Sequence, residues 1–382
     1  MKIESVKTAI VGCGMVSDIY LKNTINNFKI LDIVGCSDIY RKAADEKAQK
    51  YNIRSMTLEE VLADPSIELV INLTSPKSHF EVIKWLLEAG KNVYTEKIMT
   101  IELSDAKKLI DIANERNLYL GSAPDTFLGA GLQTAKAVLD SGMIGEVTSC
   151  NAVLNRDNNV GAEFIPYIAN EGGGIGFDVG IYFMTALTYL LGPASEVSGF
   201  MTTRNKNRKH FFPSAANFGE EYEVKCENIM VGSVKFCGGA YGTVLFNSES
   251  IMTDYPELAL HGTQGIMYLP NPDFFGGEVK VLRRGNDEPF IIQQNHGFAE
   301  NSRGVGAAEM AWAMRKQRAP RANKEMAYHA LEILHGISVS AGTKANYAMQ
   351  SSHIGSAPLP QGYIKKSKFA DFLADEEAAL AE

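Results

Sequence analysis

In the first third of the chain, short apolar segments alternate with amphipathic ones, and this alternation constrains the fold more than any other feature of the sequence. The apolar segments that fit buried strands are residues 6–11, 30–37, 53–56, 68–74, 91–97 and 118–123. The segments between them that fit helices are residues 15–27, 41–51, 58–63, 76–90 and 104–117. Nearly continuous apolar strands joined by helices are typical of a parallel sheet covered on both faces. Right-handed crossovers then predict a doubly wound, Rossmann-type α/β domain over residues 1–125.

After about residue 125 the pattern changes, and strands follow one another without helices between them. The later segments that fit strands are residues 146–155, 196–205, 227–236, 240–250, 257–270 and 277–284. The later segments that fit helices are residues 127–142, 181–192 and 303–345. This order predicts an α+β domain over residues 126–350 with a mostly antiparallel sheet. The C-terminal segment, residues 351–382, is expected to dock in part.

Charge and composition exclude several classes of protein. The 382 residues carry 37 basic and 45 acidic side chains, and this net charge of −8 argues against nucleic acid or an anionic membrane as a partner. No uncharged apolar run reaches the ~18 residues of a membrane-spanning helix, and the N-terminus lacks the apolar core of a signal peptide. The five cysteines form no CxxC pair and the seven histidines do not cluster, so neither disulfides nor a metal site are predicted. We therefore expect a soluble, cytoplasmic protein.

The strongest local motif, GCGMVS at residues 12–17, follows the first strand and opens the first helix. Its first glycine permits a tight turn, and its second lets the backbone approach a pyrophosphate at the helix N-terminus. Taken alone, such a motif is often only a structural turn. Asp38, which ends the second strand, suits the ribose hydroxyls of an adenosine, although it could also cap a helix. Its charge favours NAD over NADP, whereas Arg41 could accept a 2′-phosphate.

Two further segments follow strands, at the sheet edge where ligands of open α/β sheets bind. Residues 73–79 (LTSPKSH) suit the wall of a cofactor cleft, and a plain turn fits them equally well. His79, one turn into the helix, is by default a surface or capping residue. Glu96 and Lys97 end the next strand and could be a surface ion pair of little worth, or a lysine that bonds a substrate hydroxyl. The cofactor candidates are Gly12, Gly14, Met15, Val16, Asp38, Arg41, Thr74, Ser75, Pro76, His79, Glu96 and Lys97.

A Gly-rich segment, residues 172–182 (GGGIGFDVGIY), precedes the apolar helix of the second domain. Asp178 and Tyr182 are spaced i, i+4, so a helix that begins near Asp178 would place a carboxylate and a phenol on one face. The simpler interpretation is a capping Asp and a core Tyr. The substrate-binding candidates are Lys97, Asn155, Arg156, Tyr167, Asp178 and Tyr182. Weaker candidates, for which a surface loop or cap is the simpler interpretation, are Asn295, His296 and Arg303.

Together these segments resemble the Gfo/Idh/MocA oxidoreductases over nearly the whole chain. The motifs that carry the resemblance are AIVGCGMVS, VGCSD, INLTSPKSHFEVIKWLLEAGKNVYTEK, SGMIGEV, GGGIGFDVGIYFMTALTYLLG and LALHGTQG. The resemblance implies a dinucleotide-binding domain followed by a domain with an open, mostly antiparallel sheet. One face of that sheet usually forms an oligomer interface, and we expect a homodimer or homotetramer. Family members generally oxidise or reduce sugars, inositols and their derivatives with NAD(P).

The resemblance also implies roles for individual residues. Gly12 and Gly14 match the phosphate-binding glycines, and Asp38 matches the ribose-binding acid. Lys97 matches the catalytic lysine of the family's EKP motif, whose glutamate is Glu96 here. Asp178 would be the substrate-binding aspartate of the D-x-G-x-H motif.

Two positions depart from the family pattern. The family's proline after Lys97 is Ile98, and we expect a trans peptide there because a non-proline cis bond costs ~3 kcal/mol. The family's histidine is Tyr182, as in the branch that contains glucose–fructose oxidoreductase, xylose dehydrogenase and dimeric dihydrodiol dehydrogenase. In that branch the tyrosine is thought to serve as the acid/base.

These observations lead to the hypothesis of an NAD-dependent dehydrogenase, with NADP possible, that acts on a sugar or polyol hydroxyl. Tyr182 would move the proton, Lys97 and the positive nicotinamide ring would lower the tyrosine pKa, and Asp178 would orient the substrate. Lys97, Asp178 and Tyr182 are thus the catalytic candidates. Two alternatives stay open: an NAD-dependent glycoside hydrolase or lyase that oxidises its substrate transiently, and a non-catalytic dinucleotide sensor.

Overall fold

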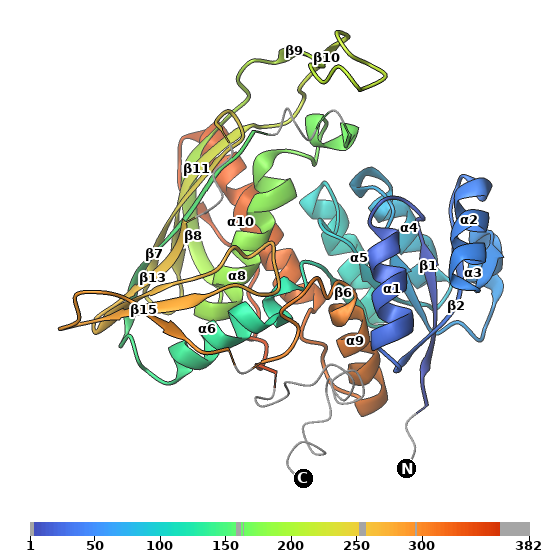
Figure 1. The fold of residues 1–382 in the computed structure, drawn as a ribbon, viewed down its shortest axis with the longest axis horizontal. Helices are drawn as coiled ribbons and strands as arrows, with labels where there is room; N and C mark the ends of the chain where they lie inside the picture. Colours follow the sequence, from blue (N-terminus) through green and yellow to red (C-terminus); the bar gives the residue numbers. More distant parts are fainter. Residues whose placement is uncertain (1–3, 158–161, 163, 252–256, 295, 360–382) are drawn as a thin grey trace.

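The N-terminal part of the chain forms a six-stranded parallel sheet with the order β3-β2-β1-β4-β5-β6 (Figure 1). Its strands are β1 (Val6–Val11), β2 (Leu31–Ser37), β3 (Arg54–Met56), β4 (Leu69–Asn72), β5 (Asn92–Thr95) and β6 (Leu120–Ser122). Its helices are α1 (Ser17–Asn27), α2 (Arg41–Tyr51), α3 (Leu58–Ala63), α4 (Pro76–Glu88) and α5 (Leu103–Glu115). The order is that of a Rossmann-type doubly wound sheet, which confirms the predicted fold class. The computed structural model describes residues 4–157, 162, 164–251, 257–294 and 296–359.

Residues at the ends of several of these helices explain where the helices begin and end. Thr57 and Glu60 form a reciprocal capping box at the start of α3, with the Thr57 side chain accepting from Glu60 N. Pro76 occupies the first turn of α4, where its missing N–H costs no hydrogen bond. α4 ends before Gly90, whose φ of 79° is accessible to glycine without strain.

The second part of the chain folds into a nine-stranded sheet with the order β16-β15-β14-β13-β7-β12-β11-β8-β17. Its strands are β7 (Val147–Asn155), β8 (Ala194–Thr202), β11 (Ile229–Phe236), β12 (Tyr241–Asn247), β13 (Glu257–Gly262), β14 (Gly265–Tyr268), β15 (Val279–Arg283), β16 (Phe290–Ile292) and β17 (Tyr347–Ala348). All neighbouring pairs are antiparallel except β7 with β12. The mostly antiparallel sheet predicted for this region is therefore confirmed.

Helices cover one face of this second sheet, and short helical turns lead into them (Figure 1). The helical segments after β6 are η1 (Thr126–Leu128), α6 (Ala130–Asp140), η2 (Pro166–Ala169), the π-helix η3 (Gly176–Gly180), α8 (Ile181–Leu191), α9 (Val305–Lys316) and α10 (Lys324–Thr343). α10 packs on β8, β11 and α8, and it also contacts β6 and α5 of the first sheet. α9 packs on β5 and β6. The C-terminal helices therefore join the two sheets.

Some expected elements are divided in the structure. The helix expected over residues 127–142 is interrupted at Gly129, where a side chain would collide with the backbone of Phe275. The helix expected over residues 303–345 is two helices, because Gln317 takes a left-handed conformation and Pro320 follows. A hairpin of β9 (Asn207–Lys209) and β10 (Glu221–Glu223), which the sequence did not indicate, projects beyond the second sheet (Figure 1). Of the C-terminal segment, the structure describes only residues 351–359.

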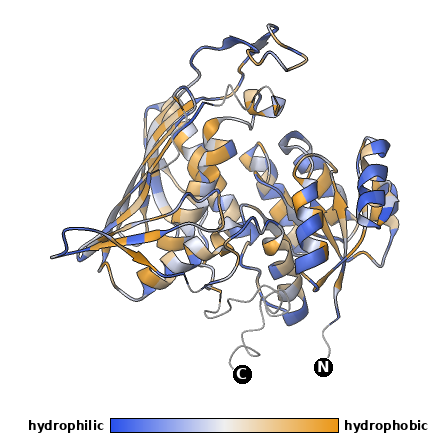
Figure 2. Ribbon diagram, in the orientation of Figure 1, coloured by the Kyte–Doolittle hydropathy of each residue, from blue (hydrophilic) through white to orange (hydrophobic). Residues whose placement is uncertain are grey.

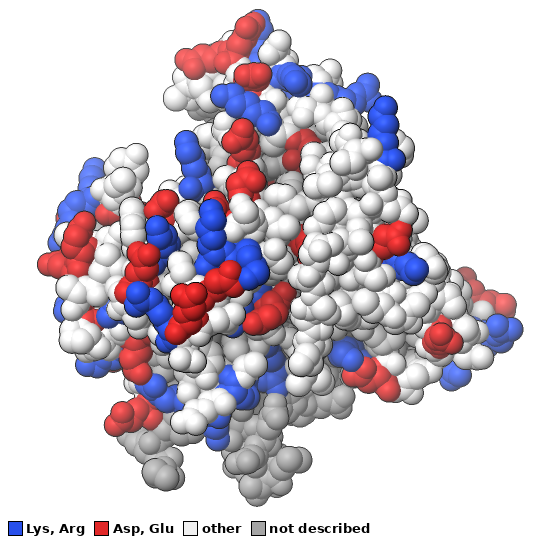
Figure 3. Space-filling model, turned by 180° about the vertical axis from the view of Figure 1, so that it is seen from behind, with Lys and Arg blue, Asp and Glu red and all other residues white. Residues whose placement is uncertain are grey.

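The hydrophobic core and the surface follow the expected division. Figure 2 shows hydrophobic residues along the strands of the first sheet and on α8, and hydrophilic residues on α2. On the face seen in Figure 3, acidic and basic side chains are interspersed rather than gathered into a patch of one sign. Among the residues the structure describes, no helix is long and apolar enough to cross a bilayer.

Candidate functional site

The loop between β1 and α1 is shaped by two glycines with different surroundings. Gly12 has a φ of 101°, and a Cβ there would lie 2.5 Å from the carbonyl carbon of Leu73, so the backbones after β1 and β4 are in close contact. A Cβ on Gly14 would meet no atom within 4 Å, which leaves its backbone open to a ligand. The Ser17 hydroxyl donates to the Gly14 carbonyl at 2.6 Å and closes the first turn of α1. This cradle fits a diphosphate at a helix N-terminus.

Asp38 lies beside this loop at the end of β2. One of its carboxylate oxygens accepts a hydrogen bond from Cys13 N at 2.7 Å, and the other accepts from Tyr40 N at 2.8 Å. The alternative in which Asp38 caps a helix is not observed, because the residue that caps α2 is Tyr40. The Arg41 guanidinium instead donates to Asp45 and to the carbonyl of Ser55.

The segments after β4 and β5 lie at the same edge of the first sheet as the β1–α1 loop. Thr74 donates its hydroxyl to Asn72 Oδ1 at 2.8 Å, and Ser75 precedes Pro76 at the start of α4 as expected. Met15 is exposed and Val16 is half-buried at the tip of the β1–α1 loop. These residues lie at the carboxyl ends of neighbouring strands.

Two expectations about these segments were wrong. His79 is not at the surface: it is fully buried, and its ring nitrogens lie 2.6 Å from the Ile98 carbonyl and 2.9 Å from the Thr74 carbonyl. Burial lowers the pKa of His79, while the two carbonyl acceptors oppose that shift, because a neutral ring can donate to only one of them. The peptide between Lys97 and Ile98 is cis rather than trans. The Ile98 side chain is buried, and its carbonyl contacts His79.

Glu96 does not pair with the Lys97 ammonium, as a surface ion pair would. Its carboxylate is nearly buried and accepts from the Tyr20 hydroxyl of α1 at 2.6 Å and from Lys97 N at 3.0 Å. Glu96 therefore fixes the backbone that carries Lys97 and leaves the lysine side chain to reach elsewhere.

The Lys97 side chain reaches the π-helix of the second region. Its Nζ donates to Asp178 Oδ1 at 2.6 Å and to the Asp178 carbonyl at 2.7 Å. The Tyr167 hydroxyl donates to the same carboxylate oxygen at 2.5 Å. The side chains of Lys97 and Asp178 are only 14% and 11% exposed, so water screens the ion pair weakly.

Tyr182, one turn further along α8, completes this cluster. Lys97 Nζ lies 5.4 Å from the centre of the Tyr182 ring. Arg303 Nη2 donates to the Tyr182 hydroxyl at 3.4 Å and to Asp273 Oδ1 at 3.3 Å. The structure thus brings together Lys97, Tyr167, Asp178 and Tyr182, as the sequence suggested, and adds Arg303, for which a surface role seemed simpler.

Contacts of Asp125 explain why Arg303 lies in the cluster although the sequence favoured a surface role for it. This buried carboxylate follows β6 and accepts from Gly304 N at 3.2 Å and from Gly306 N at 3.0 Å. It thereby anchors the start of α9 and the Arg303 that precedes it. Burial raises the pKa of Asp125 to about 6. The only sequence signals of the contact between Asp125 and the start of α9 were an acidic residue after a strand and a glycine, Gly304, before a helix.

Burial dominates the electrostatics of the cluster. Burial opposes the charged form of Asp178, but the Lys97 ammonium and the Tyr167 hydroxyl bring its pKa below the usual value. Burial also opposes the charged form of Lys97, yet Asp178 raises the pKa of that lysine well above its usual value. In the chain alone, burial raises the pKa of Tyr182 more than Lys97 lowers it. Tyr182 therefore carries its proton at neutral pH.

The remaining candidates lie outside the cluster of contacts. Asn155 Oδ1 accepts from Asn247 Nδ2 at 3.1 Å at the end of β7. Arg156 follows it, and its charge helps to lower the pKa of Asp178. His296 is buried beside the backbone of Leu359, away from Lys97. Asn295 lies outside the described residues.

Comparisons with known proteins agree with this geometry. Residues 6–123 match the model of an oxidoreductase family with an NAD-binding Rossmann fold, GFO_IDH_MocA, and residues 132–268 match the GFO/IDH/MocA C-terminal domain. The chain is 29% identical over 311 residues to the uncharacterized oxidoreductase YhhX of Escherichia coli, which covers 80% of this chain and 83% of that protein. It is 27% identical over 267 residues to scyllo-inositol 2-dehydrogenase (NAD(+)) of Bacillus subtilis, covering 69% and 73%. Levoglucosan dehydrogenase, solved in complex with NADH, shares the fold with a TM-score of 0.79 at 16% identity, covering 91% of this chain and 100% of that one.

Proposed function

The chain belongs to the Gfo/Idh/MocA family of NAD-binding oxidoreductases, and we propose that it is a dehydrogenase that acts on a hydroxyl or carbonyl of a sugar or polyol. The observation that carries this proposal is the contact of Lys97 with Asp178, beside Tyr182. An ammonium, a carboxylate and a phenol in one weakly hydrated cluster are suited to binding hydroxyl groups and moving a proton. The named relatives, an inositol dehydrogenase and a levoglucosan dehydrogenase, have polyhydroxylated substrates.

The residues around the β1–α1 loop fit the coenzyme. Gly12 and Gly14 would hold the diphosphate, and Asp38 would accept hydrogen bonds from the adenosine ribose. The negative charge of Asp38, with Arg41 engaged by Asp45, favours NAD over NADP. When bound, the nicotinamide supplies or accepts the hydride.

The chain's own residues would orient the substrate and move the proton. Asp178 accepts from a substrate hydroxyl, and Lys97 donates to the oxygen on the carbon that is oxidised or reduced. Tyr182 gives its proton to that oxygen during reduction and takes it back during oxidation. The neighbouring cations Lys97 and Arg303 both favour the tyrosinate form of Tyr182 and thereby favour proton uptake by Tyr182 during oxidation. Arg156 and Arg303 could also receive a negatively charged group of the substrate.

The open face of the second sheet supports an oligomer. Large apolar side chains are exposed there on β8, β11, β12 and β14: Phe200, Val231, Tyr241 and Tyr268. A second copy of the chain that covers this face would bury them. We propose a dimer or tetramer, which sedimentation of the purified protein would test.

A panel of sugars and polyols with NAD and NADP tests the proposed activity. A dehydrogenase releases reduced coenzyme in proportion to the substrate it consumes. Product formation without net coenzyme reduction would favour a hydrolase or lyase instead. Tight coenzyme binding without turnover across the panel would favour a sensor.

A further inference from the structure

Another buried carboxylate, on Glu227, lies beneath the Gly-rich segment that precedes the π-helix. Glu227 is 8% exposed and comes just before β11. A Cβ on Gly174 would overlap the Glu227 carboxylate, and one on Gly173 would overlap the Tyr167 carbonyl. Glycine is therefore needed at position 174 because the backbone passes directly over Glu227, and at position 173 because it passes close to the backbone of Tyr167.

Glu227 accepts hydrogen bonds from two consecutive residues at the start of the π-helix. Its Oε1 accepts from Gly176 N at 3.0 Å, and its main-chain carbonyl accepts from Ile175 N at 3.3 Å. Asp178 N in turn donates to the Gly174 carbonyl at 2.7 Å. A short chain of contacts therefore leads from Glu227 through the glycine segment to Asp178, which holds Lys97.

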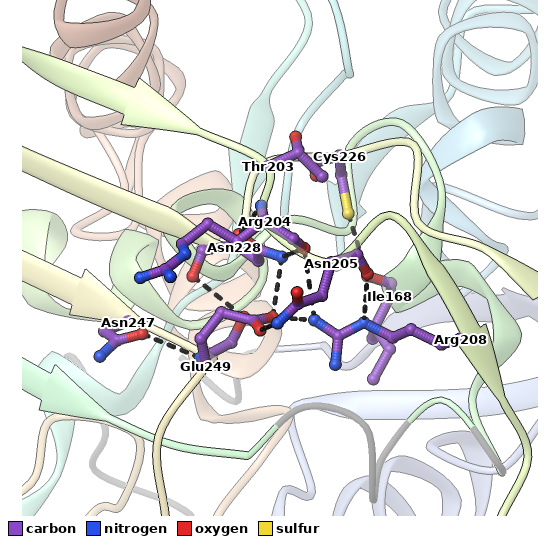
Figure 4. Close-up of polar contacts among 10 residues, drawn as sticks. Ile168, Thr203, Arg204, Asn205, Arg208, Cys226, Asn228, Asn247 and Glu249 are labelled. Carbon is purple, nitrogen blue, oxygen red and sulfur yellow. Dashed lines mark hydrogen bonds and ion pairs between the residues drawn. The ribbon is translucent and has the colours of Figure 1, made fainter.

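The segment that carries Glu227 is itself fixed on both sides, as Figure 4 shows. Cys226 Sγ donates to the carbonyl of Ile168, next to Tyr167, at 3.2 Å, and the Cys226 carbonyl accepts from Thr203 at 2.8 Å. Asn228 Nδ2 donates to the Arg204 carbonyl at 2.6 Å and to Glu249 Oε1 at 2.8 Å (Figure 4).

Glu249 also forms an ion pair with Arg208 of β9, with both side chains almost buried. These contacts tie the hairpin and the end of β12 to the segment under the π-helix (Figure 4). The position of Glu227 is therefore set by several elements of the second region.

We propose that Glu227 is a positioning residue for substrate recognition, which holds the π-helix in the register that presents the Asp178 carboxylate to Lys97 and to a substrate hydroxyl. The inference rests on the proposed dehydrogenase function and names a residue that acts through Asp178 without touching the substrate. Removal of the carboxylate would leave Gly176 N without its buried acceptor, so the π-helix would lose its fixed start.

The charge state of Glu227 gives the proposal a specific signature. Burial raises the pKa of Glu227 to about 7, against the opposing effect of the backbone N–H donors. The titratable and charged groups that face it are Asp178 on the π-helix, Cys226 beside it, and three that line the same small cavity: Arg208, Tyr222 and Glu249. An ionised carboxylate accepts a stronger hydrogen bond than a neutral one, so the site should be best ordered when Glu227 is ionised.

Three variants separate positioning from general stability: Glu227→Ala, Glu227→Gln and, as the matched control, Glu223→Gln on the exposed side of β10. In the NAD-loaded enzyme, Glu227→Ala should raise the substrate KM at least about tenfold while NADH affinity changes less than about twofold. Glu227→Gln keeps an acceptor and should stay within about threefold in KM, but the ionisation near 7 should vanish from its kcat/KM pH profile. Glu223→Gln should match the wild type throughout.

Two results would overturn the proposal: a folded Glu227→Ala enzyme with wild-type substrate KM, or a Glu227→Gln profile that retains the ionisation near 7. Backbone hydrogen exchange gives a readout that does not need turnover. Amides of the segment from Gly174 to Gly180 should exchange faster in Glu227→Ala, with the β1–α1 loop unchanged. Unchanged exchange there would refute the role of Glu227 even if no substrate is found, whereas absent turnover in the wild type would refute only the proposed function.

Discussion

Lys97 and Asp178 lie 81 positions apart in the chain, yet the lysine ammonium holds both the carboxylate and the main-chain carbonyl of the aspartate, at 2.6 and 2.7 Å. The lysine follows the fifth strand of the first sheet, and the aspartate lies in the π-helix that enters the second region. The contact therefore couples the coenzyme-binding half of the molecule to the half that would bind substrate. Its chemistry can be tested one group at a time.

Lys97→Ala and Tyr182→Phe should each lower turnover by at least about 10², because in the proposed mechanism each removes a group that donates to or exchanges a proton with the reacting oxygen. NADH affinity should stay nearly unchanged, since neither side chain belongs to the β1–α1 loop. Steady-state kinetics and NADH fluorescence titration measure the two effects. The surface variant Lys107→Ala serves as the control, and near-wild-type turnover in both site variants would refute the assigned roles.

Arg303→Met should shift the pH dependence of oxidation toward higher pH. The guanidinium beside the Tyr182 hydroxyl favours the tyrosinate, so its removal raises the pKa of that phenol further. At neutral pH, oxidation should slow by roughly tenfold while reduction is affected less. A pH profile of kcat in both directions checks this, and an unshifted rising limb in the oxidation profile would show that Arg303 does not act on Tyr182.

Asp38→Asn should relax the preference for NAD. The amide oxygen can keep the hydrogen bond from Cys13 N, although the amide nitrogen cannot accept from Tyr40 N, and the charge that repels a 2′-phosphate is gone. The ratio of kcat/KM for NAD to that for NADP should fall by about tenfold or more. Lys42→Ala, an exposed change on α2, controls for nonspecific effects. An unchanged ratio would mean that another group selects the coenzyme.

Gly12→Ala and Gly14→Ala should have opposite consequences for stability. At Gly12 a methyl group meets the Leu73 backbone at a positive φ, so the free energy of unfolding should fall by about 2 kcal/mol or more. At Gly14 the methyl group projects into open space, so stability should hold while NADH affinity drops. Thermal unfolding and NADH titration separate the two. Equal stability losses in both variants would contradict this description of the loop.

Glu227→Gln should change how stability depends on pH. In the unfolded chain Glu227 ionises near 4.5, whereas in the folded protein it keeps its proton up to about 7. Between these two pKa values the unfolded state binds fewer protons than the folded state. The contribution of Glu227 to the free energy of unfolding is therefore fully present below the unfolded-state pKa, and it is lost as the pH rises through the folded-state pKa. The variant should therefore gain about 3 kcal/mol relative to the wild type between about pH 4 and pH 8. Urea denaturation at both pH values measures the difference, and a constant difference would contradict it.

The sequence predicted the parts of the fold that depend on local periodicity. The six strands of the first sheet are the example. The hairpin β9–β10 was missed because its strands, NRK and EYE, are short and polar and carry no apolar alternation. The division of the C-terminal helices depended on a left-handed residue, Gln317, whose conformation no sequence pattern announces.

The site shows the same limit. Family resemblance and spacing were enough to select Lys97, Asp178 and Tyr182, whose roles stay predictions. His79 is buried against the loop that contains Ile98, and its ring contacts the Ile98 carbonyl. Neither the burial of His79 nor the cis peptide before Ile98 could be predicted from one of these segments alone. Arg303 enters the site only because Asp125, 179 positions before Gly304, anchors the loop beside it. Glu227 was missed because its partners are main-chain N–H groups, which leave no trace in side-chain patterns.

The return of α9 and α10 to the first sheet has a consequence for how the molecule is made. These helices cover β5, β6 and α5, yet they end near residue 343. During translation, a nascent chain that already contains the coenzyme loop still lacks the helices that shield this edge of the sheet. A protein fragment ending near residue 125 would leave the same surface exposed, so we expect such a fragment to aggregate. We also expect the coenzyme-binding half to complete its folding only after nearly the entire polypeptide has left the ribosome.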